Sequence, residues 1–296
     1  MFDAKVVTLL ALLESGGYTA AASRLGLTQP AVSHQIRQLE KEFGIQIFYR
    51  NRKELKTTPE GDILIKYARR CVAVYHSAQR AIADSKTGAT HFAVGLTPTA
   101  GENLLPQVIA TLCSENPQLH IRIAMDTIQN LYNKLEAYEL DFAIVEGTGQ
   151  RSGSLVTSLL DTDYLCLVTS PQNRLASRGS IQLPDLRDER LILRSPGTGT
   201  RRLFEDYLRS RRESIGNFNV MMEVDNIATI KELVAMDLGI TIIAHSACRG
   251  EEASGRLAVV PIAGFSMVRE INIVHPKDFS HPEILDSIRS IYAKLR

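Results

Sequence analysis

Apolar positions in the first part of the chain repeat with the period of an α-helix. Residues 4–15 are densely apolar, which predicts a helix packed on more than one side. A second stripe follows the spacing i, i+4, i+7, i+11, which places its members on one helical face that we expect to be buried: Val32, Ile36, Leu39 and Phe43. The pattern therefore predicts a small helical domain at the start of the chain.

The residues between these helices carry the signals of a tight turn. Ala22 is small enough for two helices to approach closely, and Gly26 stands where the chain must turn. The hydroxyl of Thr28 is placed to cap the next helix, and Pro30 in its first turn removes a backbone donor that has no helical partner there. The whole stretch predicts a helix-turn-helix.

The face opposite the apolar stripe is polar and cationic. It carries Pro30, His34, Arg37, Gln38 and Lys41, flanked by Gln29, Ser33 and Gln35. Such a face is often only solvated, but the start of a recognition helix is also where base edges and phosphates are met in the major groove. The helix alone leaves both readings open.

A basic segment follows the second helix and favours DNA binding. Four cations, Arg50, Arg52, Lys53 and Lys56, lie within seven residues on a predicted short hairpin, from which they can contact phosphates of the adjacent groove. The predicted DNA-binding residues are Thr28, Gln29, Pro30, Ser33, His34, Gln35, Arg37, Arg50, Arg52 and Lys53.

A long helix is predicted next, capped by Thr58 and started by Pro59, running to about residue 84. Its apolar positions repeat at the 3.5-residue period of a coiled-coil seam: Leu64, Ala68, Cys71, Tyr75, Ala78 and Ile82. The seam can pack on the chain's own domain or on a second copy. We expect a homodimer, because two helix-turn-helix units read two half-sites.

Past a polar hinge at residues 85–90 the pattern alternates between strands and helices. Strands are predicted at 91–96, 120–125, 141–145, 164–168, 191–193, 220–224, 240–243 and 267–274. Helices are predicted at 102–113, 128–138, 201–211, 227–236 and 282–295. This order predicts parallel α/β sheets with right-handed crossovers in two lobes, with the final strand and helix returning to the first lobe.

At its N-terminus the chain resembles the LysR-type transcriptional regulators. The resemblance rests on FDAKVVTLLALLESGGYTAAA, then TQPAVSHQIRQLEKEFGIQIF, then TTPEG opening the long helix, with Tyr18 and Thr57 as small departures. It extends more weakly to LRSPGTGTRRLFEDYL and IKELVAMDLGITII. It implies an effector domain similar to periplasmic solute-binding proteins, behind an all-α winged helix-turn-helix domain and a linker helix.

The predicted domains are 1–58 for DNA binding, 59–87 for the linker and 88–296 for the effector domain, with lobe I at about 91–162 and 267–296 and lobe II at about 163–266.

Ligands of α/β lobes gather beyond the carboxyl ends of strands, where helix N-termini bind anions. Four turns there supply the predicted effector-binding residues: Thr97, Thr99, Thr127, Thr198, Thr200 and Asn226. The resemblance implies that the family's effector contacts map onto the turn with Thr97 and Thr99 and the turn with Thr198 and Thr200.

These turns favour a small anion such as a carboxylate or a sulfur oxyanion. A threonine or asparagine at a helix start is also an ordinary cap, and that alternative stays open for Thr127 and Asn226. Arg201 is equally compatible with pairing an anionic ligand and with a surface charge. Asp126, beside the second turn, would restrict the ligand or favour one that carries an amine.

Charge and composition agree with this organisation. Residues 1–90 carry 13 lysines and arginines against 8 acidic residues, a net charge of +5, and the remainder carries 21 against 25, a net charge of −4. No apolar run reaches the roughly 18 residues of a membrane span, and the first helix is not a signal peptide, so we expect a cytoplasmic protein without membrane contact.

The sequence contains none of the common motifs of catalytic or metal sites. GxSxG, a Walker loop, GxGxxG after the first strand and HExxH are all missing, and no two of the seven histidines stand at metal-ligand spacing. Cys71, Cys113, Cys166 and Cys248 are far apart and are expected to be free thiols, with a redox pair disfavoured by the 82 positions between the last two. We therefore expect no catalytic residue, no metal and no cofactor.

The sequence thus predicts a DNA-binding transcriptional regulator whose promoter activity responds to a small anionic metabolite between two lobes. The alternative is a small-solute-binding α/β protein without a transcriptional role. Expected partners are double-stranded promoter DNA, the effector and a second copy, with RNA polymerase as a further candidate partner. The resemblance to the family implies a homotetramer. The target promoter, the effector and the direction of regulation are not encoded in these patterns.

Overall fold

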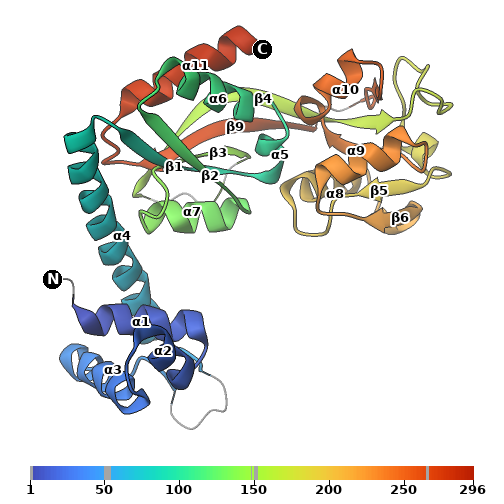
Figure 1. Ribbon diagram of the computed structural model, residues 1–296. Helices are drawn as coiled ribbons and strands as arrows, with labels where there is room; N and C mark the ends of the chain where they lie inside the picture. The colour runs from blue at the N-terminus through green and yellow to red at the C-terminus, as the bar shows by residue number, and fades with distance from the viewer. Residues whose placement is uncertain (1–2, 50–54, 148, 150–152, 265–266) are drawn as a thin grey trace. The chain divides into compact units, whose positions relative to one another are not determined.

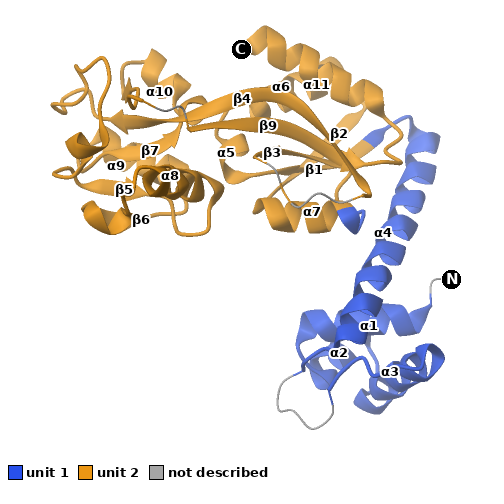
Figure 2. Cartoon of the chain, turned by 180° about the vertical axis from the view of Figure 1, so that it is seen from behind, with its two compact units in different colours: residues 1–90, 136–139 blue, residues 91–135, 140–296 orange. Residues whose placement is uncertain are grey.

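The computed structural model describes residues 3–49, 55–147, 149, 153–264 and 267–296. The chain divides into two units, one formed by residues 1–90 with 136–139 and the other by residues 91–135 with 140–296 (Figure 2). Arg50, Arg52 and Lys53, predicted to bind DNA, lie outside the described residues.

The first unit begins with three helices: α1 (Ala4–Ser15), α2 (Tyr18–Leu25) and α3 (Gln29–Phe43). Gly26 ends α2 with φ of 65°, a left-handed conformation that glycine adopts without a steric penalty. The helices share one apolar core that includes Leu9, Leu12, Ala22, Val32, Ile36 and Leu39. The predicted helix-turn-helix is therefore present, but Phe43 is 53% exposed and does not join the buried stripe, because it lies in the last turn of α3 beyond the core.

Helix α4 (Pro59–Thr87) begins as predicted and continues three residues beyond the expected end. The Thr58 hydroxyl accepts a hydrogen bond from Gly61 N at 2.9 Å and donates to the Gln46 carbonyl. An antiparallel bridge between Phe48 and Thr57 closes the segment before it. These contacts fix the start of α4 on the helix-turn-helix core.

The predicted seam along α4 is only partly correct. Ala68 is buried and Leu64 half-buried, and both pack with the core of the first unit. Tyr75 and Ile82 of the predicted seam are exposed, and so are three large apolar residues that the seam did not include, Ile63, Tyr67 and Val74. Periodicity located an apolar face, but the first turns of that face are covered by the chain's own domain.

The second unit is built of two lobes, labelled by their elements in Figure 1. Lobe I contains β1 (Thr90–Leu96), β2 (Leu119–Met125), β3 (Phe142–Glu146), α5 (Pro98–Gly101), α6 (Leu105–Glu115), α7 (Ile128–Glu136) and α11 (Pro282–Leu295). The predicted helix at 102–113 is wrong in its start, since Asn103 Oδ1 accepts a hydrogen bond from Leu105 N at 2.8 Å in the turn between α5 and α6.

Lobe II contains β5 (Leu191–Leu193), β6 (Val220–Glu223), β7 (Thr241–Ala244), β8 (Ala258–Val260), α8 (Gly199–Ser210), α9 (Ile227–Ala235) and α10 (Arg249–Ala253). Short 3-10 helices lie at Leu183–Leu186, Ile215–Asn217 and His245–Ala247. One apolar core fills this lobe, with Phe204 and Ile230 buried in it. Strand β8 and helix α10 have no counterpart among the predicted elements.

Two long strands, β4 (Leu155–Thr169) and β9 (Met267–Pro276), join the lobes (Figure 1). They pair antiparallel from Leu155 opposite Pro276 to Leu165 opposite Met267, with a register shift near Asp161. The sheet order is β2-β1-β3-β9-β4-β7, with β8 beside β4. Two crossings between lobes are as predicted, but a purely parallel sheet is wrong, because the crossing strands run antiparallel to each other and β9 runs antiparallel to β3.

None of the described helices is both long enough and apolar enough to cross a membrane.

Candidate nucleic-acid interface and ligand pocket

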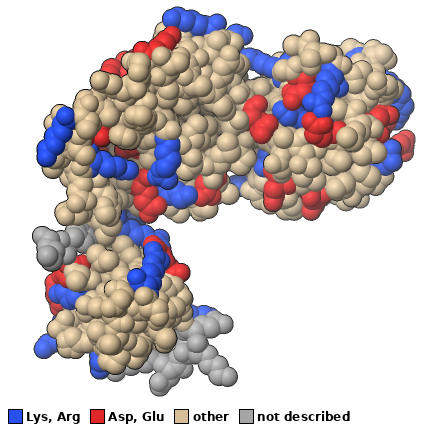
Figure 3. All heavy atoms as spheres, viewed as in Figure 1, with Lys and Arg blue, Asp and Glu red and all other residues tan. Residues whose placement is uncertain are grey.

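Helix α3 presents its predicted polar face on the surface of the first unit. Thr28 caps the helix, its hydroxyl oxygen accepting from Ala31 N at 3.3 Å. Gln29, Pro30, His34 and Arg37 are exposed and Ser33 is half-buried. Lysine and arginine side chains lie at several places on the surface of this unit (Figure 3). The outward face of α3 thus combines hydrogen-bonding groups near its start with a cation one turn later.

Gln35 differs from the other predicted DNA contacts. Its side-chain oxygen accepts a hydrogen bond from the Thr8 hydroxyl at 2.5 Å, and the side chain is half-buried. This bond joins α1 to α3 inside the domain. The structure therefore gives Gln35 a partner within the fold, which a face assigned by helical angle could not reveal.

The segments on either side of the basic residues are joined by a short ladder of hydrogen bonds. Tyr49 N donates to the Lys56 carbonyl at 3.0 Å, next to the bridge between Phe48 and Thr57. Lys56 is exposed. The ladder brings the two ends of the basic segment together beside the helix-turn-helix core.

A pocket of about 260 Å³ lies between the two lobes of the second unit. The lining from lobe I consists of Thr97, Pro98, Thr99, Thr127, Ile128, Gln129 and Glu146, and the lining from lobe II of Arg194, Gly197, Thr198, Gly199, Thr200 and Arg202; Arg269 on the crossing strand β9 completes it. Five of the six predicted effector residues are thereby brought together. A volume of this size suits a small molecule.

Asn226 is not among the residues that line this pocket. Its side-chain oxygen accepts from Thr229 N at 2.9 Å and caps α9. Asn226 therefore serves as the helix cap that the sequence left open as its alternative role.

Two charged residues considered from the sequence also have partners outside the lining. Arg201 is buried and contacts the carboxylates of Glu205 at 2.6 Å and Glu223 at 3.1 Å. Asp126 contacts the Lys134 ammonium at 2.7 Å. Neither the pairing of Arg201 with a ligand nor an amine site at Asp126 is supported by these contacts.

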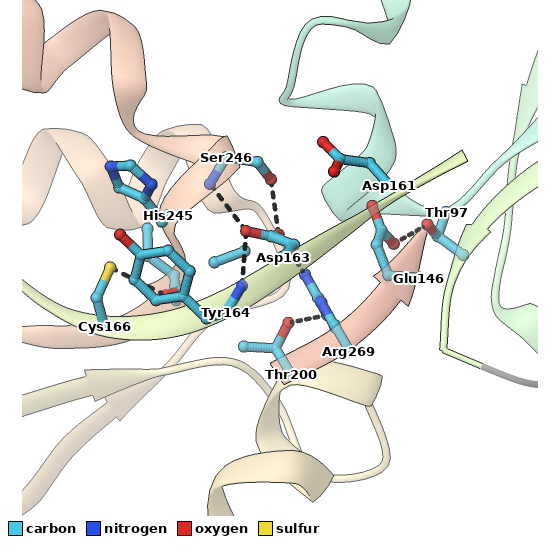
Figure 4. Close-up of polar contacts among 12 residues, drawn as sticks. Thr97, Glu146, Asp161, Asp163, Tyr164, Cys166, Thr200, His245, Ser246 and Arg269 are labelled. Carbon is cyan, nitrogen blue, oxygen red and sulfur yellow. Dashed lines mark hydrogen bonds and ion pairs between the residues drawn. The ribbon is translucent and has the colours of Figure 1, made fainter. Parts of the chain in front are cut away.

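Glu146, at the end of β3, was missed by the sequence reasoning. Its side chain is buried; Oε2 accepts a hydrogen bond from the Thr97 hydroxyl, and Oε1 has no hydrogen-bond partner (Figure 4). Burial raises the pKa of this carboxyl above its ordinary value, and the nearby Arg269 opposes that shift only in part. The group is thus an unusually basic carboxyl facing the pocket.

Arg269 lies between the lobes and was also missed. Its guanidinium donates to the Thr200 hydroxyl at 3.3 Å and lies 3.6 Å from the Asp163 carboxylate. Asp163 in turn accepts from the hydroxyl of Ser246 at 2.7 Å and from its backbone N at 3.2 Å (Figure 4). Arg269 Nε is buried without a hydrogen-bond partner, and the buried Nη2 has only the ion pair with Asp163.

Arg194 directly follows β5 and is the second arginine of the lining. Its side chain is 4% exposed, and Nε has no hydrogen-bond partner. Burial lowers the pKa of its guanidinium, with the Asp225 charge opposing the shift. Buried guanidinium nitrogens without partners are costly, so the pocket wall has unmet capacity to bind an anion.

Two cysteines judged distant from their sequence separation are neighbours in lobe II. Cys166 and Cys248 are both fully buried, and a hydrogen bond between their thiols, together with burial, raises the pKa of Cys166. Sequence separation was therefore the wrong argument against proximity. The raised pKa nevertheless disfavours the thiolate form that oxidation requires.

No group of three or more histidine, cysteine, aspartate or glutamate side chains suited to a metal ion occurs in the described part of the chain. The pocket instead offers hydroxyls, guanidiniums and one carboxyl.

Known proteins share both parts of this architecture. The chain is 28% identical to the transcriptional regulator CysL of Bacillus subtilis over 272 residues, covering 90% of this chain and 89% of that protein. It is 30% identical to the regulator CbbR of Xanthobacter flavus over 267 residues, covering 89% and 79%. The full-length CbnR structure in complex with its target DNA has the same fold, with a TM-score of 0.69, 17% identity and 99% of both chains covered.

Family comparison agrees with these likenesses. Residues 4–62 match the bacterial regulatory helix-turn-helix proteins of the lysR family, and residues 86–293 match the LysR substrate binding domain. The two matches span the helices of the first unit and both lobes of the second. The chain belongs to the LysR family of transcriptional regulators.

Proposed function

We propose that α3 and the basic segment after it bind promoter DNA, and that a small anion in the pocket between the lobes alters this binding. The observation that carries the proposal is the exposed polar and cationic face of α3 on a helix-turn-helix core, in a chain whose second unit holds a pocket with buried arginines. The proposed role requires no catalysis and no cofactor.

Within this proposal the residues divide into two sets. Gln29, Ser33 and His34, near the start of α3, contact base edges in the major groove, where side-chain amides and hydroxyls discriminate between bases. Arg37 contacts phosphates, as do Arg50, Arg52 and Lys53, which lie outside the described residues. Thr28 acts as a cap, and Gln35 supports α3 through Thr8.

We further propose that α4 pairs with the α4 of a second copy. Ile63, Tyr67, Val74 and Ile82 are each at least 49% exposed, and their spacing keeps them within one side of the helix. A second copy would cover this face and place two copies of α3 on two half-sites. We place the domain boundaries at 58/59 and 87/88, on either side of this helix, and propose a tetramer assembled through the effector domains.

The proposed ligand is a small anion. Thr198 and Thr200 lie at the N-terminus of α8, where free backbone N–H groups favour negative charge. Arg194 and Arg269 supply guanidinium donors on the same wall. Thr97, Thr99 and Thr127 face them from lobe I. An anion held by both lobes would favour their closed arrangement and could thereby pass a signal to the first unit.

The two residue sets predict different results in DNA binding. Ser33→Ala or Gln29→Ala should change which bases are preferred in a selection from randomised duplexes, because each removes a proposed base contact. Arg52→Ala should instead weaken binding to all sequences alike and reduce its salt dependence. Arg122→Ala, an exposed arginine of β2, is the matched control and should change neither property.

Two results would overturn these assignments. A shift of base preference in Arg52→Ala with none in the α3 variants would exchange the proposed roles. Absence of DNA binding by the wild-type chain, with retained anion binding, would support a solute-binding protein without a transcriptional role.

A further inference from the structure

The two walls of the pocket carry different chemistry. On lobe I, the buried carboxyl of Glu146 keeps one oxygen without a partner while Thr97 donates to the other. On lobe II and β9, Arg194 and Arg269 line the same pocket, and the buried Nε of each has no hydrogen-bond partner, whereas Arg269 Nη2 lies 3.6 Å from the Asp163 carboxylate. A ligand that satisfies only the arginines would leave Glu146 Oε1 buried and unpaired.

We propose that the pocket selects a small organic acid bearing a hydroxyl or keto oxygen: Arg194 and Arg269 bind its carboxylate, and Glu146 hydrogen-bonds its neutral oxygen. This inference rests on the proposed function of the pocket and assigns the ligand class that its lining recognises. Glu146 thereby becomes the residue that determines specificity, and Thr97 fixes the orientation of its carboxyl.

The surroundings of Glu146 favour a neutral partner over an amine. Its side chain is buried, and burial favours the protonated form, which can donate its hydrogen to a ligand oxygen. Arg269, whose charge opposes this, is already shared with Asp163 and Thr200. A ligand ammonium would require an ionised Glu146 and would bring a further cation close to two buried arginines.

The size of the pocket limits the carbon skeleton. Its volume of about 260 Å³ lies near the lower end of the range for small-molecule pockets, which favours acids of a few carbons.

Matched triplets of acids test the inference on the full-length chain by isothermal titration calorimetry. The triplets are propionate, L-lactate and L-alanine; succinate, L-malate and L-aspartate; and glutarate, L-2-hydroxyglutarate and L-glutamate. Within at least one triplet the hydroxy acid should bind about tenfold more tightly than the other two members, which corresponds to one hydrogen bond. A preferred amino acid, a preferred unsubstituted acid, or no binding in any triplet would overturn the inference.

Two substitutions at Glu146 separate a neutral from a charged carboxyl. Glu146→Gln keeps the shape and a neutral donor, so it should retain the preference for the hydroxy acid, whereas Glu146→Leu should abolish it. Loss of the preference in both variants would mean that the wild-type carboxyl acts as a charge, against the proposal. Glu115→Gln, an exposed glutamate at the end of α6, is the matched control, and melting curves without ligand verify that every variant is folded.

Titration with inorganic sulfate distinguishes failure of this inference from failure of the proposed function. Three results together would mean that the pocket is an anion site and that only the ligand class is wrong: sulfate binds, Arg194→Gln abolishes that binding, and no hydroxy acid is preferred. If neither sulfate nor any acid binds to the wild-type chain, the proposed role of the pocket fails with it.

Discussion

Replacement of Gly61 by alanine provides a test in which two physical effects have opposite signs. Gly61 lies in the first turn of α4, where alanine is intrinsically favoured over glycine by about 1 kcal/mol. The structure predicts the reverse outcome. A Cβ at this position would lie 2.3 Å from the carbonyl oxygen of Ile47 and 3.0 Å from its carbonyl carbon, both backbone atoms that cannot rotate away.

The size of the effect follows from what the added carbon must displace. Relief of the contact requires α4 or the Ile47 backbone to move by roughly 1 Å, and overpacking of this kind costs about 1–3 kcal/mol. The same movement strains the bond from Thr58 N to the Ile47 oxygen at 3.0 Å and the Thr58 cap on Gly61 N, worth about 1 kcal/mol. After subtraction of the helix propensity, Gly61→Ala should destabilise the first unit by about 1–3 kcal/mol.

Thermal unfolding followed by circular dichroism at 222 nm measures this, since the chain has no tryptophan to report by fluorescence. Each kcal/mol lowers the melting temperature of a domain of this size by roughly 4–8 °C. Gly250→Ala, at a helical glycine with open space around its Cβ position, is the control and should raise stability slightly. A Gly61→Ala protein as stable as wild type would refute the packing of α4 against Ile47.

Three further predictions concern single contacts. Folding raises the pKa of the Glu146 carboxyl above its ordinary value of 4.5. The carboxyl therefore stabilises the fold below pH 4.5, and this contribution is lost as the pH rises through the pKa of the folded state. Glu146→Gln should accordingly gain stability over wild type as the pH rises above 4.5. Urea unfolding on both sides of that pH measures the difference, and a constant difference would contradict the raised pKa. The Lys231 ammonium lies 3.3 Å from the Glu102 carboxylate and joins α9 of lobe II to lobe I. A double-mutant cycle on this pair should give a coupling free energy of about 0.5–1 kcal/mol. A coupling of zero would mean that the ion pair contributes nothing to stability. Gln35→Ala leaves the Thr8 hydroxyl without its acceptor and should cost about 1 kcal/mol of stability with base preference unchanged, and an altered preference in a duplex selection would make Gln35 a base contact after all.

Local signals predicted the helical elements well. The caps at Thr28 and Thr58, the glycine turn at Gly26 and the apolar period all act over a few residues, so the sequence contains the whole cause of each helix start. What the sequence did not contain is which neighbour an apolar face meets. Ala68 packs on its own domain whereas Phe43 stays 53% exposed outside the core, although both fit the predicted periods.

The pocket was predictable to the extent that its residues follow strands. Glu146 and Arg194 each end a short apolar run, FAIVE and LILR, and a charged residue at the carboxyl end of a buried strand was a usable signal that was overlooked. Arg269 gave no such signal. It lies within the long strand β9, and its place between the lobes depends on antiparallel pairing with β4, which the expected parallel topology did not include.

The central claim is that the first unit binds a DNA duplex mainly through cations and that the second unit regulates this binding. The most direct test is the fluorescence anisotropy of a labelled duplex from the chain's own upstream control region, titrated with the purified protein over a range of salt concentrations. The account predicts that the logarithm of the binding constant falls linearly with the logarithm of salt, with a slope of about −0.9 for each phosphate contacted. No binding at any salt concentration, or binding that does not depend on salt, would contradict it.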